Sequence, residues 1–265
     1  MMRGVQVEVP PSATARLNEL SLNRDLALDA SRSCQQKINQ LGDDAPPQML
    51  ARLVAERDRQ AGINSILHRL LSATNQWLFQ LRLPPGRVLA PVNVPISLTK
   101  GQTAQEAIGK LRVEMLAIAQ ELQRIRHAPL PIADQIGAVE RYVAQRGAVT
   151  GPRIGVVRDQ LQLQWPDDVI ASKQDMIGVL CWLAPTSVVA ALKREIEQAP
   201  AAAGALPAAD RIAKVAELES RLLDLERRES ALLERAEGVL PRPEMSPLAY
   251  LQVEIVAREA AAAVA

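Results

Sequence analysis

Aromatic residues are nearly absent from this 265-residue chain, which has three Trp, two Tyr and one Phe. Aromatic-rich β-sandwich cores and base-stacking surfaces for nucleic acid both depend on such side chains. The core must therefore come from Leu, Val, Ile and Ala within the 48% of hydrophobic residues. This composition favours helices packed on helices.

Cysteine and histidine are also scarce, with two of each. Cys34 and Cys181 stand far apart, so we expect two buried thiols and no disulfide framework. His68 and His127 lie within or at the end of expected helices, and no Cys/His pairing has zinc-ligand spacing. The sequence contains no phosphate loop, dinucleotide-binding, zinc-protease or nucleophile-elbow motif. We expect no cofactor, no metal and no enzymatic activity.

One acidic cluster, Asp167-Asp168 with Asp175, could suggest a metal site. It comes just before an expected helix, where carboxylates cap the helix and complement its dipole. We therefore assign it to the helix start and not to a metal.

Long apolar runs and net charge are missing as well. The longest apolar candidate, Met176–Ala184, is shorter than the roughly 18 residues of a membrane span, and Met1–Ser12 lacks the apolar region of a targeting signal. With 31 basic and 30 acidic side chains, no overall field draws the chain to nucleic acid or to an anionic membrane. We expect a cytoplasmic protein, free or within an assembled particle, that makes no membrane contact.

The most informative feature present is an apolar seam between Asp210 and Val239. Its members follow the alternating three- and four-residue step of coiled coils, and Glu229 interrupts them. A helix with this pattern needs another surface to cover the apolar stripe. The predicted oligomerisation seam consists of Val215, Leu218, Leu222, Leu225, Leu232, Ala236 and Val239.

Two partners for this seam remain open. A second chain could cover it as a coiled coil, in which Glu229 would set the register or mark the end of the partner. Alternatively, the helix could pack on the chain's own N-terminal helices. The Leu222-Leu223 and Leu232-Leu233 doublets support this alternative, because they make the stripe wider than a pure coiled-coil seam.

The N-terminal region predicts a strand followed by two long helices. Alternating valines indicate a short strand over residues 5–9. A second apolar helical pattern runs from about Pro47 to Leu81, and the short loop before it predicts an antiparallel helical hairpin over Ser12–Leu81. The first helix has a seven-residue repeat of Leu20, Ala27, Cys34 and Leu41.

Proline interrupts the helical pattern between residues 83 and 102. Because proline cannot donate to a strand ladder, the segment predicts an extended linker or an edge strand. Helix returns at Thr103, where Thr103 and Glu106 form a capping-box motif. A shorter helix is expected over Ile132–Arg146, with Gly147 as its stop.

The following region predicts a β-hairpin over Gly151–Trp165, because two short apolar runs flank a polar turn. Helical stretches follow at about 176–183 and 186–198. An Ala/Pro-rich joint separates them from the seam helix. A last helix is expected from Ser246-Pro247, with Leu251, Ile255 and Val256 on its apolar face.

Together these patterns predict a mainly α fold. It consists of a long antiparallel helical hairpin, central helices with a small β-hairpin, and a C-terminal coiled-coil-like arm. The expected regions are 1–82 (strand and helical hairpin), 83–102 (extended Pro-rich linker), 103–198 (central helices with the β-hairpin), 199–208 (joint) and 209–265 (coiled-coil-like helices).

We expect a non-enzymatic structural or assembly protein that oligomerises with itself or with other assembly proteins through helix packing. A virion or other large-particle component is one concrete form. The alternative is a nucleic-acid-associated accessory or regulatory module, which would need a basic stripe. A further alternative is an enzyme that uses scattered carboxylates in an apolar pocket. The residues of the possible basic stripe are Arg112, Arg124, Arg126 and Arg141.

Overall fold

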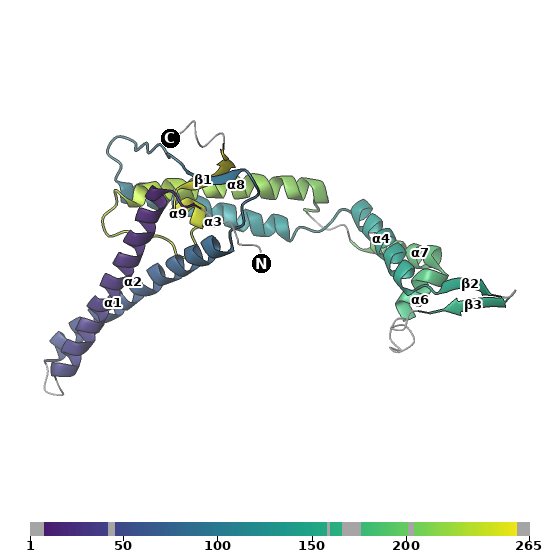
Figure 1. The fold of residues 1–265 in the computed structure, drawn as a ribbon, viewed down its shortest axis with the longest axis horizontal. Coiled ribbons are helices and arrows are strands. Elements are labelled where there is room, and N and C mark those ends of the chain that lie inside the picture. The colour runs from purple at the N-terminus through teal and green to yellow at the C-terminus, as the bar shows by residue number, and fades with distance from the viewer. Residues whose placement is uncertain (1–7, 42–45, 158–159, 166–175, 201–203, 259–265) are drawn as a thin grey trace. The chain divides into compact units, whose positions relative to one another are not determined.

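The computed structural model describes residues 8–41, 46–157, 160–165, 176–200 and 204–258 (Figure 1). This described part is mainly helical and has two small antiparallel sheets of two strands each, which confirms the mainly α fold class. The chain divides into two compact units, unit 1 with residues 1–120 and 218–265, and unit 2 with residues 121–217. Most of the strand expected over residues 5–9 lies outside the described residues, and Glu8 and Val9 are not in a strand.

Unit 1 contains both ends of the described chain. The regions expected from the sequence were consecutive and did not combine the two ends in one unit. Two helices, α3 (Ala104–Arg126) and α8 (Ala208–Leu233), contribute residues to both units. The other elements of unit 1 are α1 (Pro11–Leu41), α2 (Pro47–Gln80), β1 (Arg87–Pro91), α9 (Pro247–Tyr250) and β4 (Val253–Ala257).

Helices α1 and α2 lie side by side (Figure 1). Leu20 packs with Leu67, and the Arg57 guanidinium donates to the Gln35 side chain at 2.9 Å, so the two helices run in opposite directions. The buried residues of α1 form a narrow stripe with seven-residue spacing, and those of α2 lie in its C-terminal half. The buried residues of α1 are Ala13, Leu20, Ala27 and Cys34.

The first sheet pairs β1 with β4 in antiparallel register, so that Leu89 stands opposite Ile255. The predicted Pro-rich segment therefore contains a short strand. Pro91 is its last residue, which is compatible with a ladder because proline occurs at strand edges and ends. Leu89 and Val253 are buried in a cluster with Ala13 of α1.

The expectation of a long final helix is wrong. Helix α9 ends at Tyr250, and residues 253–257 form strand β4. Gln252 adopts a left-handed backbone with φ 50° between the two elements, which interrupts the helix. The β-branched residues Val253, Ile255 and Val256 then follow the strand preference of their side chains.

Helix α3 begins at the predicted capping box. The Thr103 hydroxyl accepts from the Glu106 amide at 3.2 Å, and the Glu106 carboxylate accepts from the Thr103 amide at 3.1 Å. In unit 1, α3 packs on α8 through a buried cluster. The buried members of that cluster are Ala107, Ile108, Leu232 and Ala236.

Unit 2 packs two helices on α4 and carries the second sheet (Figure 1). Strands β2 and β3 pair in antiparallel register with Val156 opposite Leu161, as expected for Gly151–Trp165. Trp165, just after β3, meets Trp182 edge to face at 5.4 Å between ring centroids. The elements of unit 2 are α4 (Ile132–Thr150), β2 (Arg153–Val157), β3 (Gln160–Gln164), α6 (Met176–Leu183) and α7 (Pro185–Gln198).

Gly147 does not end its helix, contrary to the sequence-based expectation. Helix α4 continues to Thr150, and Gly147 lies buried inside it. The residue instead allows close helix packing, because a Cβ at this position would stand 2.9 Å from the Cys181 carbonyl oxygen. Gly151 has the same role, since its Cβ would clash with the Trp182 ring at 2.4 Å.

Candidate functional site

The seven residues of the predicted seam differ in burial within the single chain. Leu225, Leu232 and Ala236 are buried, and the last two pack on α3 through Ala107 and Ile108. The chain itself therefore covers the C-terminal part of the seam. The half-buried members are Val215, Leu218, Leu222 and Val239.

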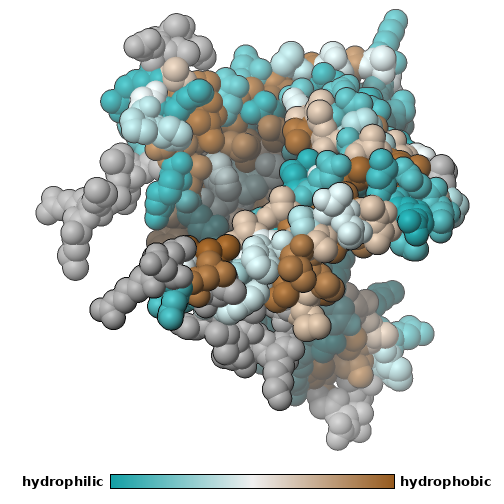
Figure 2. Space-filling model, turned by 90° about the vertical axis from the view of Figure 1, so that its right-hand side faces the viewer, coloured by the Kyte–Doolittle hydropathy of each residue, from teal (hydrophilic) through white to brown (hydrophobic). Residues whose placement is uncertain are grey.

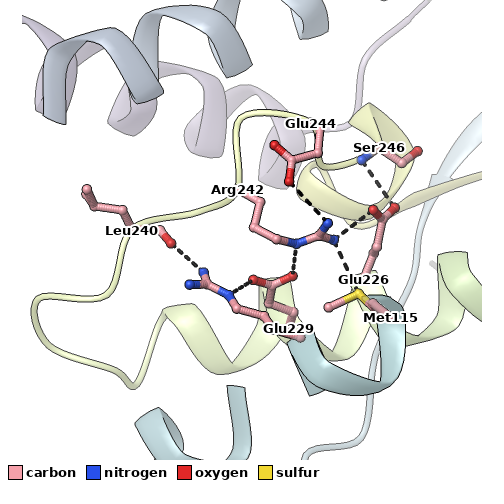
Figure 3. A network of polar contacts seen from close by, with 8 residues as sticks. Met115, Glu226, Glu229, Leu240, Arg242, Glu244 and Ser246 are labelled. Atoms are coloured by element: carbon pink, nitrogen blue, oxygen red, sulfur yellow. Dashed lines mark hydrogen bonds and ion pairs between the residues drawn. The ribbon is translucent and has the colours of Figure 1, made fainter. Parts of the chain in front are cut away.

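Glu229, which interrupts the seam, is the centre of a buried ion-pair cluster in unit 1 (Figure 3). Its two carboxylate oxygens accept from Arg112 Nε at 2.7 Å and from Arg242 Nε at 2.9 Å. Arg242 also donates to Glu226 at 2.8 Å and lies 3.6 Å from Glu244. We call Arg112, Glu226, Glu229 and Arg242 the ion-pair cluster.

Backbone and sulfur atoms complete the polar contacts of this cluster. Arg112 Nη2 donates to the Leu240 carbonyl at 2.6 Å, and the Ser246 amide donates to Glu226 at 3.2 Å. Arg242 Nη2 lies 3.2 Å from the sulfur of Met115 (Figure 3). The cluster thus ties α3, α8 and the segment 240–246 together.

Within the ion-pair cluster, the pKa values of Glu226 and Arg242 are shifted. Burial raises the pKa of the Glu226 carboxyl, and the Arg242 hydrogen bond and the Ser246 amide act in the opposite direction. Burial disfavours the charged form of Arg242, but the carboxylates of Glu229 and Glu226 outweigh it, so the pKa of the guanidinium is raised. Buried charges persist where such partners are present.

The ion-pair cluster is suited to holding structure, not to catalysis. The Glu229 side chain has no exposed surface, and both of its oxygens accept from guanidinium groups. A general base needs hydrogen-bond access to a substrate proton. Sequence reasoning missed Glu226 and Arg242. The only available signal was the pair Glu226 and Glu229, one helical turn apart beside an apolar seam.

A groove of about 590 Å³ lies elsewhere in unit 1. Its walls are α3, α8 and the extended segment Val92–Ser97, and its charged lining residues are of both signs. Its volume is in the range of about 300–1,000 Å³ that is typical of ligand sites. The apolar part of the lining includes Val94, Ile96, Ala107, Leu111 and Leu232.

Unit 2 exposes many large apolar side chains. Helix α6 has no charged residue, and one of its faces packs on α4 through the buried Gly178 and Cys181. No other described element covers its remaining large side chains. The exposed fractions on this helix are 70% for Met176, 59% for Ile177, 48% for Leu180 and 68% for Leu183.

Other elements of unit 2 also expose large apolar side chains. Ile154 and Leu161 are 63% and 65% exposed and project to the same side of the hairpin, because residues 154 and 156 share a face and Leu161 stands opposite Val156. Tyr142 and Val149, seven residues apart on α4, are 51% and 67% exposed. Figure 2 shows hydrophobic residues, in brown, exposed at the surface next to hydrophilic residues, in teal. We call the exposed residues of α6 and the hairpin the apolar face of unit 2.

Membrane-spanning character is limited to one combination in the described residues. No single helix there is both long and apolar enough to cross a bilayer. Helices α6 and α7 have sufficient length and apolar composition only when they are taken together, and they are bent by 109° at their junction.

Two of the four residues of the possible basic stripe pair with carboxylates of the same chain. Arg112 belongs to the ion-pair cluster, and Arg124 makes two hydrogen bonds to Glu121. That pairing lowers the pKa of Glu121 and raises the pKa of Arg124. Arg126 and Arg141 are exposed on α3 and α4.

The remaining chemistry-bearing residues do not form a site in the described part of the chain. Cys34 and Cys181 are buried free thiols, as expected. His68 and His127 are exposed. No group of three His, Cys, Asp or Glu residues in the described ranges could hold a metal ion. The acidic cluster Asp167, Asp168 and Asp175 falls outside those ranges.

Comparison of the chain with protein-family models, with curated proteins and with solved structures finds no match.

Proposed function

We propose that this chain is a non-enzymatic assembly protein that associates with further copies of itself through the apolar face of unit 2. In this proposal, unit 1 is the rigid part, fixed internally by the ion-pair cluster. Unit 2 presents the contact surface. A component of a large particle is the setting that suits such a subunit.

The observation that carries this proposal is the exposure of α6. A helix that is apolar on all sides is normally buried on all sides. Among the residues that the structure describes, α4 covers one face of α6, and four large apolar side chains of α6 are between 48% and 70% exposed. Contiguous apolar surface of this kind marks sites of protein association.

A second copy of the chain is the occupant that fits best. Residues 121–217 carry eleven basic and eleven acidic side chains, so two copies of unit 2 approach without net repulsion. The same balance gives no attraction to a strongly charged partner. An apolar helix face is also self-complementary, which an isologous two-fold contact requires. A standard interface buries about 800 Å² per partner, and the apolar side chains of α6 and the hairpin would form its centre.

The test is absolute mass by size-exclusion chromatography with light scattering, over a wide concentration range. We expect discrete multimers of the natural chain. The variant I177E/L183E, which places charges on the exposed face of α6, should shift the population toward monomer by at least tenfold in dissociation constant. Circular dichroism checks that its helix content is unchanged.

The matched control is L22E/L26E on α1. These leucines are 58% and 59% exposed and lie one helical turn apart, so the control changes the same number of exposed apolar side chains in unit 1. We expect it to leave the mass unchanged. A natural chain that is monomeric at every concentration would overturn the proposal, and so would equal effects of the two variants. Sedimentation of the natural chain, but not of I177E/L183E, with neutral lipid vesicles would assign α6 to a membrane surface instead.

A further inference from the structure

The segment Val92–Ser97 has the geometry of a strand but lacks a strand partner. Its residues alternate between half-buried Val92, Val94 and Ile96 and exposed Asn93, Pro95 and Ser97. This is the two-residue period of an extended chain that covers a core on one side. It continues β1 beyond Pro91, where pairing with β4 stops.

The backbone of this segment is largely unpaired. The Val92 amide donates to the Gln252 carbonyl at 2.8 Å. Beyond it, the amides of Asn93, Val94, Ile96 and Ser97 have no hydrogen-bond acceptor among the residues that the structure describes. An unpaired extended edge is the structural template for addition of a further strand.

The groove beside this edge has an excess of unpaired positive charge. Glu114 is paired with Arg221, and Asp224 lies 3.7 Å from Arg227. Lys110 and Arg228 line the same groove and have no ion-pair partner within the described residues. The available charge in the groove is therefore positive, although the whole chain is nearly neutral.

Charge and apolar lining occur together in this groove. Leu111, Leu232 and Ile96 supply apolar contacts next to the two free cations. An occupant with this chemistry alternates acidic and apolar side chains in an extended backbone. Carboxylates would then meet Lys110 and Arg228, apolar side chains would enter the groove, and backbone groups would pair with the segment 93–97.

We propose that the groove between Val92–Ser97, α3 and α8 binds an extended acidic and apolar peptide segment of a partner protein. Peptides that add to a sheet edge obtain affinity from main-chain hydrogen bonds and specificity from alternate side chains. The Lys110 and Arg228 side chains select the acidic positions. This site lies in unit 1 and does not depend on association through unit 2.

The experiment measures fluorescence anisotropy of a labelled hexapeptide in which Glu and Val alternate, with the full chain as titrant. We expect saturable binding that weakens with added salt, because exposed charge pairs are screened. A dipeptide of Glu and Val should bind at least tenfold more weakly, since it cannot span the edge. Equal binding of the dipeptide would reduce the site to one for small carboxylates and overturn the proposal.

The charge-reversed variant K110E/R228E should lower the affinity for the Glu–Val hexapeptide at least tenfold. The same variant should bind a hexapeptide of alternating Lys and Val more tightly than the natural chain does. Such a gain of binding would show that the variant is folded and that charge in the groove selects the peptide.

The matched control is K37E/R52E. It changes the net charge of the chain by the same amount, through exposed cations of α1 and α2. We expect less than a twofold effect on binding of the Glu–Val hexapeptide. Equal losses in both variants would show a general charge effect and overturn the site, as would absence of saturable binding to the natural chain. Light scattering of K110E/R228E separates this result from self-association, because the variant leaves the apolar face of unit 2 intact.

Discussion

Gly147 of α4 lies directly against the main chain of Cys181 in α6. A Cβ atom on Gly147 would stand 2.9 Å from the Cys181 carbonyl oxygen and 3.1 Å from the Trp182 nitrogen. These neighbours are backbone atoms, which cannot move aside as the end of a flexible side chain can. The contact between α4 and α6 in unit 2 therefore depends on the absence of a side chain at position 147.

The substitution G147A should destabilise unit 2. Overpacking of this kind costs about 1–3 kcal/mol, which exceeds the gain of about 0.5–1 kcal/mol from replacing a helical glycine by alanine. We expect the loss in urea-induced unfolding followed by circular dichroism. G137A on the same helix is the control, since its Cβ would meet only the end of Arg141 at 3.5 Å. That variant should be neutral or more stable, and an equal loss in both would contradict the close-packing explanation.

Removal of the Glu229 carboxylate should destabilise unit 1 strongly. The variant E229Q leaves Arg112 and Arg242 facing each other without the shared negative charge, and breaking a buried pair costs about 3 kcal/mol or more. Thermal and urea unfolding of the full chain measure the loss. The control is E244Q, whose side chain is 61% exposed and 3.6 Å from Arg242. Exposed pairs contribute about 0–1 kcal/mol, so similar losses in the two variants would contradict a central role for Glu229.

The carboxyl of Glu226 should make stability dependent on pH. Because burial raises its folded pKa above the ordinary value of 4.5, the folded state holds the proton more tightly than the unfolded chain does. This contribution to stability is present below pH 4.5 and is lost as pH rises through the folded pKa. The variant E226Q should therefore gain in free energy of unfolding relative to the natural chain as pH rises from 4.5. Urea titrations at a series of pH values test this, and a difference that stays constant or falls would contradict it.

The phenol of Tyr250 should resist ionisation. Burial raises the pKa of Tyr250 from 10.0 to about 12, and the nearby charge of Arg16 acts in the opposite direction. Its contribution to stability is present below pH 10 and is lost as pH rises through about 12. In the variant Y142F, Tyr250 is the only tyrosine. Its absorbance change on ionisation should appear near pH 12 in the folded chain and near pH 10 in denaturant. Coincident transitions while circular dichroism still reports the folded state would contradict the burial of this group.

Local patterns in the sequence were sufficient for several elements. The seven-residue repeat of α1 predicts a buried stripe, and Leu20, Ala27 and Cys34 are buried. The Thr103 and Glu106 capping box forms as its motif predicts. These features depend on helix geometry and on hydrogen bonds within one turn, so the chain specifies them without distant contacts.

Other elements depended on contacts that a local pattern does not contain. Ile255 and Val256 fit a helical stripe and a strand equally well, and pairing with β1 decides in favour of the strand. Glycine commonly ends a helix, but Gly147 lies inside α4, where the absence of a side chain allows close packing on Cys181. In both cases the deciding neighbour is far away in sequence.

Composition and periodicity are sufficient to predict a mainly helical chain with an apolar stripe between Asp210 and Val239, because heptad spacing puts the apolar residues on one side of a helix. What covers the C-terminal part of this stripe becomes known from the folded chain, in which Leu232 and Ala236 pack on α3. The tertiary structure also decided the environment of Glu229. The physical reason is that a repeat specifies where an apolar stripe lies but not its partner, and a buried carboxylate persists only where folding brings cations to it.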